Sequence, residues 1–282
     1  MASQVQLAQR TNLSKRPKRK LIESRSRDFV SALSNGLSVL AALSDSPHGI
    51  SLEKLGKRTG LKKTTTWRLA QTLVDLGYVR QDTETRCFAP APRVLTLGYA
   101  YFDSLDLRQL AEPFLQELSA RVGESVDMAV LDGDRAIFVE RIRTPQVVSV
   151  SIHVGSTIPL YNTALGKALI CDMPESWLQE YIKRHRNHPT GQAYFKNGGR
   201  KLRRLLSKTR ELGYSINDRE LFKDLLSIAS PLRGRTNKVV AAINIVVPTS
   251  RMSMCQLQRS FVPHLLQAAE KISLALGYRS FH

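Results

Sequence analysis

The sequence is poor in the features that define several large classes of protein. Its 282 residues include only three cysteines, Cys87, Cys171 and Cys255, which follow no CxxC or Cys/His spacing. A disulfide framework and a zinc finger are therefore not expected. No apolar run reaches the length of a membrane-spanning helix or resembles a signal peptide. We therefore expect a cytoplasmic protein without a membrane partner.

Motifs that carry catalysis are also lacking. No GxSxG, Walker-type loop or GxGxxG following a strand is found. His185 and His188 lie three residues apart in KRHRNH, but no carboxylate stands at ligand spacing, which favours a solvated basic segment over a metal site. We expect no enzyme, and hence no catalytic residue, no metal and no cofactor.

Acidic residues are few, with 24 Asp and Glu against 42 Lys and Arg and a net charge of +18. Residues 1–91 hold 16 basic and 7 acidic side chains, and residues 92–282 hold 26 and 17. The excess of positive charge is therefore about twice as dense in the N-terminal third. This favours a polyanionic partner, although a merely soluble basic protein would share the excess.

The first 27 residues are polar and basic, with SKRPKRK at residues 14–20, and show no apolar periodicity. Such a composition predicts a disordered arm. The arm either follows DNA phosphates or a minor groove, as basic arms do, or serves only as a solubilising tail.

The stretch Ser51–Gly77, SLEKLGKRTGLKKTTTWRLAQTLVDLG, predicts two short helices joined by a tight turn. Ser51 is a good N-cap, and Gly60 is suited to end the first helix because glycine enters the left-handed conformation without a Cβ penalty. The second helix is expected from about Lys62 to Leu76. On a helical wheel its inward face consists of Thr66, Leu69, Ala70, Leu73, Val74 and Leu76, with Trp67 at the border.

The outward face of that second helix carries short hydroxyls, one Gln and one Arg instead of the Glu/Lys mixture of a solvated helix. These groups suit base edges and phosphates. A short hairpin is expected next, with strands at residues 77–80 and 86–89. The candidate DNA contacts are Lys62, Lys63, Thr64, Thr65, Arg68, Gln71, Thr72, Arg80 and Arg86.

Helix-turn-helix followed by a hairpin is the order of a winged helix-turn-helix domain, which we place at residues 28–91. Its supporting helix is predicted from the helical spacing of Phe29, Leu33, Leu37, Leu40 and Leu43. An ordinary helical hairpin with a polar outer face is the alternative. Residues 92–107 are apolar nearly all round, which indicates a linker helix that packs on another subunit or between two domains of one chain.

Residues 108–282 predict an α+β domain with a mostly antiparallel sheet. Strands are expected at 125–131, 135–143, 147–154, 213–219, 225–232 and 239–247, and residues 155–162 are expected as a loop. Helices are expected at 110–122, 164–171, 175–185, 199–212 and 254–276.

Four segments in order resemble the IclR family of bacterial transcriptional regulators: LGKRTGLKKTTTWRLAQTLVDLGYV, RVLTLGYAY, GSTIPLYNTALGKALI, and GYSINDRELFKDLLSIASPLRG followed by VVAAINIVVP. Within the family, DFVSALSNGLSVL and ESVDMAVLDGDRAIFVERI look most like regulators of aromatic-acid (protocatechuate and β-ketoadipate) catabolism. The resemblance implies a winged helix that binds double-stranded operator DNA, a GAF-like domain that binds a small effector, and homodimers that often pair into tetramers.

The resemblance also implies an effector pocket lined by the loop and helix start at residues 161–165 and by later strands. At matching positions these residues are Tyr161, Asn162, Thr163, Leu165, Asn217, Ser227, Asn244 and Val246. A helix N-terminus after Asn162 would suit a carboxylate. Thr163 as a simple cap and Asn244 as a satisfied strand residue are the structural alternatives.

The sequence departs from the family in one place. Relatives usually show Gly-Leu-Arg-Ser before the Ile-Ala of the signature, whereas residues 224–227 read Asp-Leu-Leu-Ser. The effector implied by the resemblance is an aromatic acid or a β-ketoadipate-like dicarboxylate. The missing Arg leaves this class open, with a different effector or a weaker response as the alternatives. The alternative function is a small-molecule-binding or dimerising module without specific DNA binding, which would show little salt dependence.

Overall fold

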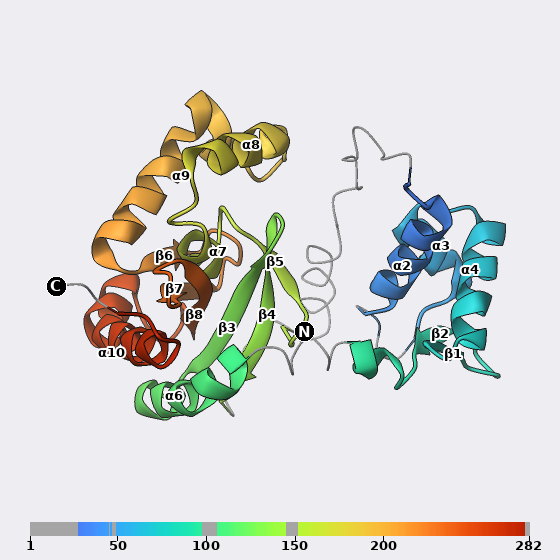
Figure 1. Cartoon of the computed structure of the whole chain (residues 1–282), viewed down its shortest axis with the longest axis horizontal. Coiled ribbons are helices and arrows are strands. Elements are labelled where there is room, and N and C mark those ends of the chain that lie inside the picture. The colour runs from blue at the N-terminus through green and yellow to red at the C-terminus, as the bar shows by residue number, and fades with distance from the viewer. Residues whose placement is uncertain (1–27, 45, 47–48, 98–105, 145–151, 280–282) are drawn as a thin grey trace. The chain divides into compact units, whose positions relative to one another are not determined.

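The computed structural model describes residues 28–44, 46, 49–97, 106–144 and 152–279. The expected basic arm, residues 98–105 of the expected linker helix and most of the strand expected at 147–154 lie outside these residues. The chain divides into two compact units, residues 1–104 and 105–282, which are considered separately below (Figure 1).

The first unit is a winged helix-turn-helix domain. It consists of α2 (Ser31–Leu43), α3 (Leu52–Thr59), α4 (Lys63–Asp75), β1 (Val79–Gln81) and β2 (Phe88–Pro90). The two strands pair antiparallel, and Ile50 adds an isolated bridge to Phe88. A small core of fully buried apolar side chains holds these elements together, with Val39, Leu43, Leu55 and Ala70 from the helices.

The turn between α3 and α4 forms as the sequence predicts. The Ser51 hydroxyl accepts from Lys54 N, and Gly60 closes α3 in the left-handed conformation at φ 72°. Local capping chemistry thus fixes both ends of α3.

Two expectations about apolar faces in this unit are wrong. Leu33 and Leu37 of α2 are 62% and 57% exposed, because Val39, Ala42 and Leu43 form the buried side of that helix instead. Leu76 is 51% exposed, because α4 ends at Asp75 and Leu76 is its C-cap residue.

The second unit is an α+β domain built on one antiparallel sheet. Its strands are β3 (Ser125–Asp132), β4 (Arg135–Ile142), β5 (Thr157–Pro159), β6 (Ser215–Asp218), β7 (Leu225–Arg233) and β8 (Val239–Pro248). They lie in the order β5-β4-β3-β8-β7-β6, and each neighbouring pair is antiparallel.

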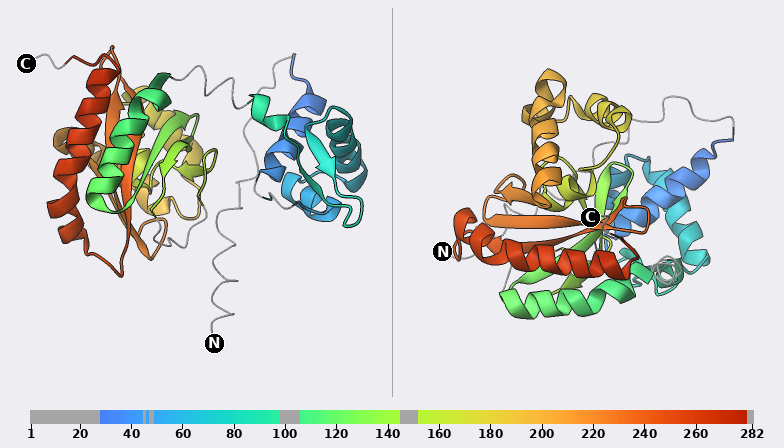
Figure 2. Two further views of the ribbon diagram at one scale, coloured as in Figure 1. Left: turned by 90° about the horizontal axis from the view of Figure 1, so that it is seen from below. Right: turned by 60° about the vertical axis from the view of Figure 1, so that its left-hand side comes forward.

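Helices cover both faces of this sheet. α6 (Asp106–Val122) and α10 (Met254–Ala275) lie side by side on one face (Figure 2). The other face carries α7 (Ala164–Leu169), followed by α8 (Glu175–His185) and α9 (Gln192–Leu212). The alanines Ala129, Ala229 and Ala242 let α7 pack closely on the centre of the sheet.

The sequence misses one strand of this unit and the first turn of α9. Residues 157–159, expected as part of a loop, form the edge strand β5, while His153–Ser156 make the turn before it. α9 is interrupted by left-handed residues at Asn197, Gly198 and Gly199, and its continuous part begins where the sequence predicts a helix start.

Candidate functional sites

The helix expected to contact DNA is anchored by one buried face. Thr66 is fully buried and its hydroxyl donates to Lys62 O at 3.0 Å, and Ala70 is also fully buried. The opposite face is open to solvent: the exposed candidates are Lys62, Lys63, Thr64, Thr65, Arg68 and Thr72, and Gln71 is half-buried. The helical wheel therefore orients this helix correctly.

Five of these side chains have no hydrogen-bond or ion-pair partner among the described residues: Lys62, Lys63, Thr64, Thr65 and Arg68. The other two are already engaged on their own helix. Gln71 donates from Nε2 to Asp75 Oδ1 at 3.2 Å, and Thr72 donates to Arg68 O at 2.9 Å. A contact from Gln71 to a base would have to replace its bond to Asp75.

The hairpin adds exposed cations on a stiff turn. The Asp82 carboxylate accepts from the backbone N–H groups of Thr85 at 2.7 Å and Glu84 at 3.2 Å, and these bonds lower the pKa of Asp82. Arg80 and Arg86 are exposed on either side of this turn, so both cations are available to a ligand.

Other arginines of this unit hold the fold together. Arg58 donates to Ala42 O at 3.1 Å and to the Ser46 hydroxyl at 2.9 Å. Arg93 donates to Leu76 O at 3.0 Å and lies over the Tyr78 ring. The structure thus distinguishes arginines that stabilise the fold from cations that are available to bind a polyanion. The net charge of the sequence does not make this distinction.

In the second unit, the loop that leads into α7 is tightly packed. Thr163 accepts from Gly166 N at 3.0 Å and donates to Pro159 O at 2.6 Å, and Leu165 is 1% exposed. Gly166 is required because a Cβ would lie 2.3 Å from Leu160 Cα. Thr163 therefore acts as the cap that the sequence offered as its structural role. α7 has only six residues, so its dipole would stabilise a bound carboxylate less than the sequence suggests.

Four of the expected effector residues lie on strands and share the face of the sheet that α7 covers: Asn217, Ser227, Asn244 and Val246. The strand register aligns Asn217, Ser227, Val246 and Ser125 in one row across the sheet. The next row contains Ser215, Ala229, Asn244, Asp127 and Arg141. Side chains in a row share a face because side chains alternate along each strand.

Asn217 and Asn162 join these rows to the α7 loop. Asn217 donates from Nδ2 to Asn162 O at 2.7 Å and accepts from Glu220 N at 3.1 Å. Tyr161 is buried, and its hydroxyl contacts Thr190 Oγ1 at 2.6 Å. The Asn162 side chain is buried, and its Oδ1 has no hydrogen-bond partner among the described residues. Such an atom is costly unless a ligand or water satisfies it.

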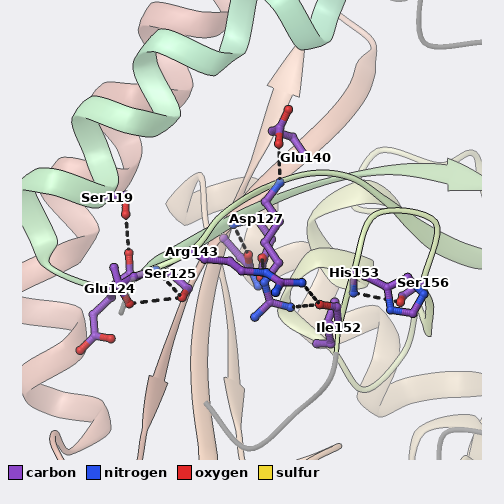
Figure 3. Close-up of polar contacts among 12 residues, drawn as sticks. Ser119, Glu124, Ser125, Asp127, Glu140, Arg143, Ile152, His153 and Ser156 are labelled. Carbon is purple, nitrogen blue, oxygen red and sulfur yellow. Dashed lines mark hydrogen bonds and ion pairs between the residues drawn. The ribbon is translucent and has the colours of Figure 1, made fainter. Parts of the chain in front are cut away.

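The sequence did not identify a buried ion pair on the same face. Asp127 is 1% exposed, and Arg141 Nε lies 3.3 Å from its Oδ1. This distance allows an ion pair, but the alignment is too poor for a hydrogen bond, so neither oxygen of Asp127 has a hydrogen-bond partner among the described residues. Arg141 and Arg143 instead both donate to Ile152 O, at 2.7 and 3.3 Å (Figure 3).

Burial dominates the protonation of this carboxyl. Removal from water raises the pKa of Asp127 to about 6, and the charges of Arg141 and Arg143 oppose the rise. A single acidic residue inside the apolar strand VDMAVL was the available sequence signal. The Asn244 side chain accepts a hydrogen bond from Asp127 N at 3.2 Å. Asn244 therefore has a partner on the neighbouring strand, as in the structural alternative to a ligand role.

A second buried ion pair closes the other end of α7. Lys167 is 1% exposed and its Nζ lies 2.6 Å from Glu220 Oε2. Burial lowers the pKa of Lys167, and Glu220 opposes this. Because Glu220 N also donates to Asn217 Oδ1, this pair fixes the loop that carries Asn217.

Neither a metal cluster nor a membrane span is found in the part of the chain that the structure describes. No group of three or more His, Cys, Asp or Glu side chains gathers among those residues, and no helix there is long and apolar enough to cross a bilayer. His185 contacts Tyr181 O at 2.9 Å, and His188 contacts the Tyr161 hydroxyl at 3.2 Å. Both histidines have structural partners.

Comparison with known proteins agrees with this architecture. Residues 32–83 match the IclR helix-turn-helix domain, and residues 99–274 match the bacterial transcriptional regulator IclR C-terminal domain. The Pca regulon regulatory protein of Pseudomonas putida is 30% identical over 246 residues, which cover 87% of this chain and 84% of that protein.

Solved structures show the same fold. An IclR family transcriptional regulator from Brucella abortus is 28% identical with a TM-score of 0.74, covering 90% of this chain and 95% of that one. An IclR homolog from Microbacterium hydrocarbonoxydans, complexed with 4-hydroxybenzoate, is 24% identical with a TM-score of 0.72, covering 87% and 99%. The matched domains and relatives are DNA-binding transcriptional regulators rather than enzymes. The chain therefore belongs to the IclR family of bacterial transcriptional regulators.

Proposed function

We propose that this regulator reads its operator through the free outward face of α4, with Arg68 as the principal base-reading side chain. The observation that carries the proposal is that Arg68, Thr64 and Thr65 are exposed side by side with no partner among the described residues. Lys62 and Lys63 at the helix start supply positive potential for phosphates. Arg80 and Arg86 on the hairpin are proposed as further phosphate contacts.

Fluorescence anisotropy with the DNA upstream of the protein's own gene tests this interface. Arg68→Ala is expected to weaken binding by about 1–3 kcal/mol and to relax specificity at one base pair. Arg259→Ala is the matched control, because it removes the same charge from an exposed position on α10 in the other unit. Unchanged operator affinity in Arg68→Ala would remove this residue from the reading face.

Salt dependence separates base contacts from phosphate contacts. Each phosphate neutralised contributes about −0.9 to the slope of log K against log salt. Lys63→Ala is expected to reduce the magnitude of that slope and to weaken all sequences equally. Binding that ignores both sequence and salt would instead favour the alternative, a ligand-binding or dimerising module that does not recognise DNA specifically.

We propose in addition that the effector is a small hydroxylated aromatic acid bound on the α7 face of the sheet. Its hydroxyl would donate to Asp127, whose carboxylate is buried and lacks a donor among the described residues. Its remaining polar groups would meet Asn217, Ser227 and Asn244, which lie on the same face within one to three strand spacings of about 4.8 Å. They would also meet Asn162, whose backbone oxygen accepts from Asn217.

Titration with three acids tests the effector class. 4-Hydroxybenzoate and protocatechuate carry phenolic donors, whereas β-ketoadipate does not. We expect the phenolic acids to alter operator affinity, and we expect Asp127→Asn to weaken their binding. The P. putida relative is named for the Pca regulon, and the M. hydrocarbonoxydans homolog was crystallised with 4-hydroxybenzoate, which makes 4-hydroxybenzoate the first ligand to test. A response only to β-ketoadipate would refute the role of Asp127.

We infer that the active form is a homodimer, with a dimer of dimers as the larger assembly. The support is apolar surface in the first unit: Leu33, Leu37, Leu95 and Leu97 are each more than half exposed. Apolar patches of this kind mark interaction sites. Analytical ultracentrifugation gives the oligomeric state directly, and a monomer at micromolar concentration would contradict the inference.

A further inference from the structure

A hollow of about 640 Å³ lies between α8 and α9, away from the effector residues. This volume is within the range of small-molecule sites. Its lining contains four arginines: Arg200, Arg203, Arg204 and Arg210. The only acidic residue in the lining is Glu175, and Met173 and Leu178 provide apolar surface beside the guanidinium groups.

Positive charge in the second unit is concentrated around this hollow. Residues 174–213 contain ten Lys and Arg but only three Glu, a net charge of +7. The whole of residues 92–282 has a net charge of +9. The sheet and the helices α6 and α10 are therefore close to neutral, and the hollow is the electropositive centre of the unit.

Two of the four arginines have internal partners. Arg203 lies 2.8 Å from Glu175, and Arg210 donates to Cys171 O at 2.9 Å. Arg200 and Arg204 are exposed and have no partner among the described residues. Both face the same hollow one helical turn apart, and like charges at this spacing destabilise a helix slightly. An anion between them would remove that repulsion.

We propose that this hollow binds a small polyanion with two or three linked phosphate groups. Guanidinium groups bind phosphate oxygens bidentately, which favours arginine over lysine for this task. One Glu against four arginines leaves three positive charges for the ligand, which matches a di- or triphosphate better than a single carboxylate. An open hollow of this size has room for a compact anion, whereas the phosphates of a duplex follow an extended backbone.

Isothermal titration of the full-length protein with inorganic tripolyphosphate tests the proposal. Arg200→Ala/Arg204→Ala is expected to weaken binding about a hundredfold, since a hydrogen bond to a charged group is worth about a factor of ten or more. Lys183→Ala/Arg186→Ala is the matched control, because it removes the same charge from exposed positions at the end of α8 outside the lining. The control is expected to change affinity by less than about threefold.

Orthophosphate and a random-sequence duplex complete the experiment. Tripolyphosphate is expected to bind more than about tenfold tighter than orthophosphate, because more oxygens meet the arginines. No tripolyphosphate binding, or equal losses in the two double variants, would overturn the proposal. A duplex affinity that falls only in Arg200→Ala/Arg204→Ala, without tripolyphosphate binding, would assign the surface to nucleic acid instead. The variants do not touch α4, so operator binding without polyphosphate is expected to remain unchanged.

Discussion

Replacing Asp127 with Asn is expected to stabilise the protein above neutral pH. The pKa of Asp127 is raised from 3.8 to about 6 by burial. The folded state therefore binds the proton more tightly than the unfolded state, and the free energy of unfolding falls as pH rises between these two values. Each unit of pKa shift corresponds to about 1.36 kcal/mol, so ionisation of Asp127 costs about 3 kcal/mol at pH 8.

Asn resembles the protonated carboxyl, so Asp127→Asn avoids this cost. From the two pKa values, the variant is expected to be more stable than the parent by about 1–2 kcal/mol at pH 5 and about 3 kcal/mol at pH 8. Urea unfolding at both pH values measures the difference, with Asp132→Asn, exposed at the end of the same strand, as the control. A difference that does not grow with pH, or a variant less stable than the parent at pH 8, would refute the assignment of burial as the dominant cause.

Three further predictions concern packing. Gly166→Ala is expected to lower the free energy of unfolding by about 1–3 kcal/mol or more, because the new Cβ would meet the Leu160 backbone at 2.3 Å; urea unfolding measures it, and a neutral effect would contradict the close approach. Gly36→Ala is expected to raise stability by up to about 1 kcal/mol, since the nearest atom, in the Leu69 side chain, is 4.0 Å away; a lower unfolding midpoint would contradict this. Leu37→Ser is expected to weaken self-association without lowering the stability of the monomer, as sedimentation and urea unfolding report; a loss of stability alone would mean that Leu37 packs within its own chain.

The sequence predicts the helix-turn-helix well because its signals are local. Ser51 and Gly60 define α3 through capping and backbone conformation, and the outward face of α4 follows from a simple wheel. In α2 the apolar residues at helical spacing extend beyond what the small core covers, so Leu37 remains exposed. Local patterns fix element type, but they do not fix how much of an apolar surface the neighbouring elements cover.

The effector face was only partly predictable because it depends on register. Asn217 and Asn244 were assigned by resemblance, and the structure places both on the α7 face. Asp127 and Arg141 are 14 residues apart and become neighbours only when β3 and β4 pair with the irregularity after Met128. No spacing in the sequence predicts that pairing. The only signal was a carboxylate within an otherwise apolar strand.

Both proposed sites depend on a charged side chain that a ligand can satisfy, although one side chain is exposed and the other is buried. Arg68 is exposed and has no partner in the described part of the chain, which costs little in water and leaves five donors for a base or phosphate. Asp127 is buried and accepts no hydrogen bond from the residues that the structure describes, which costs stability until a ligand supplies one. Effector binding can alter the population of two conformations only if the ligand interacts differently with each of them. A buried carboxyl provides such a difference if it lacks a donor in one conformation and gains one from the ligand in the other. Loss of the effector response in Asp127→Asn, with operator affinity retained, would connect this residue to regulation.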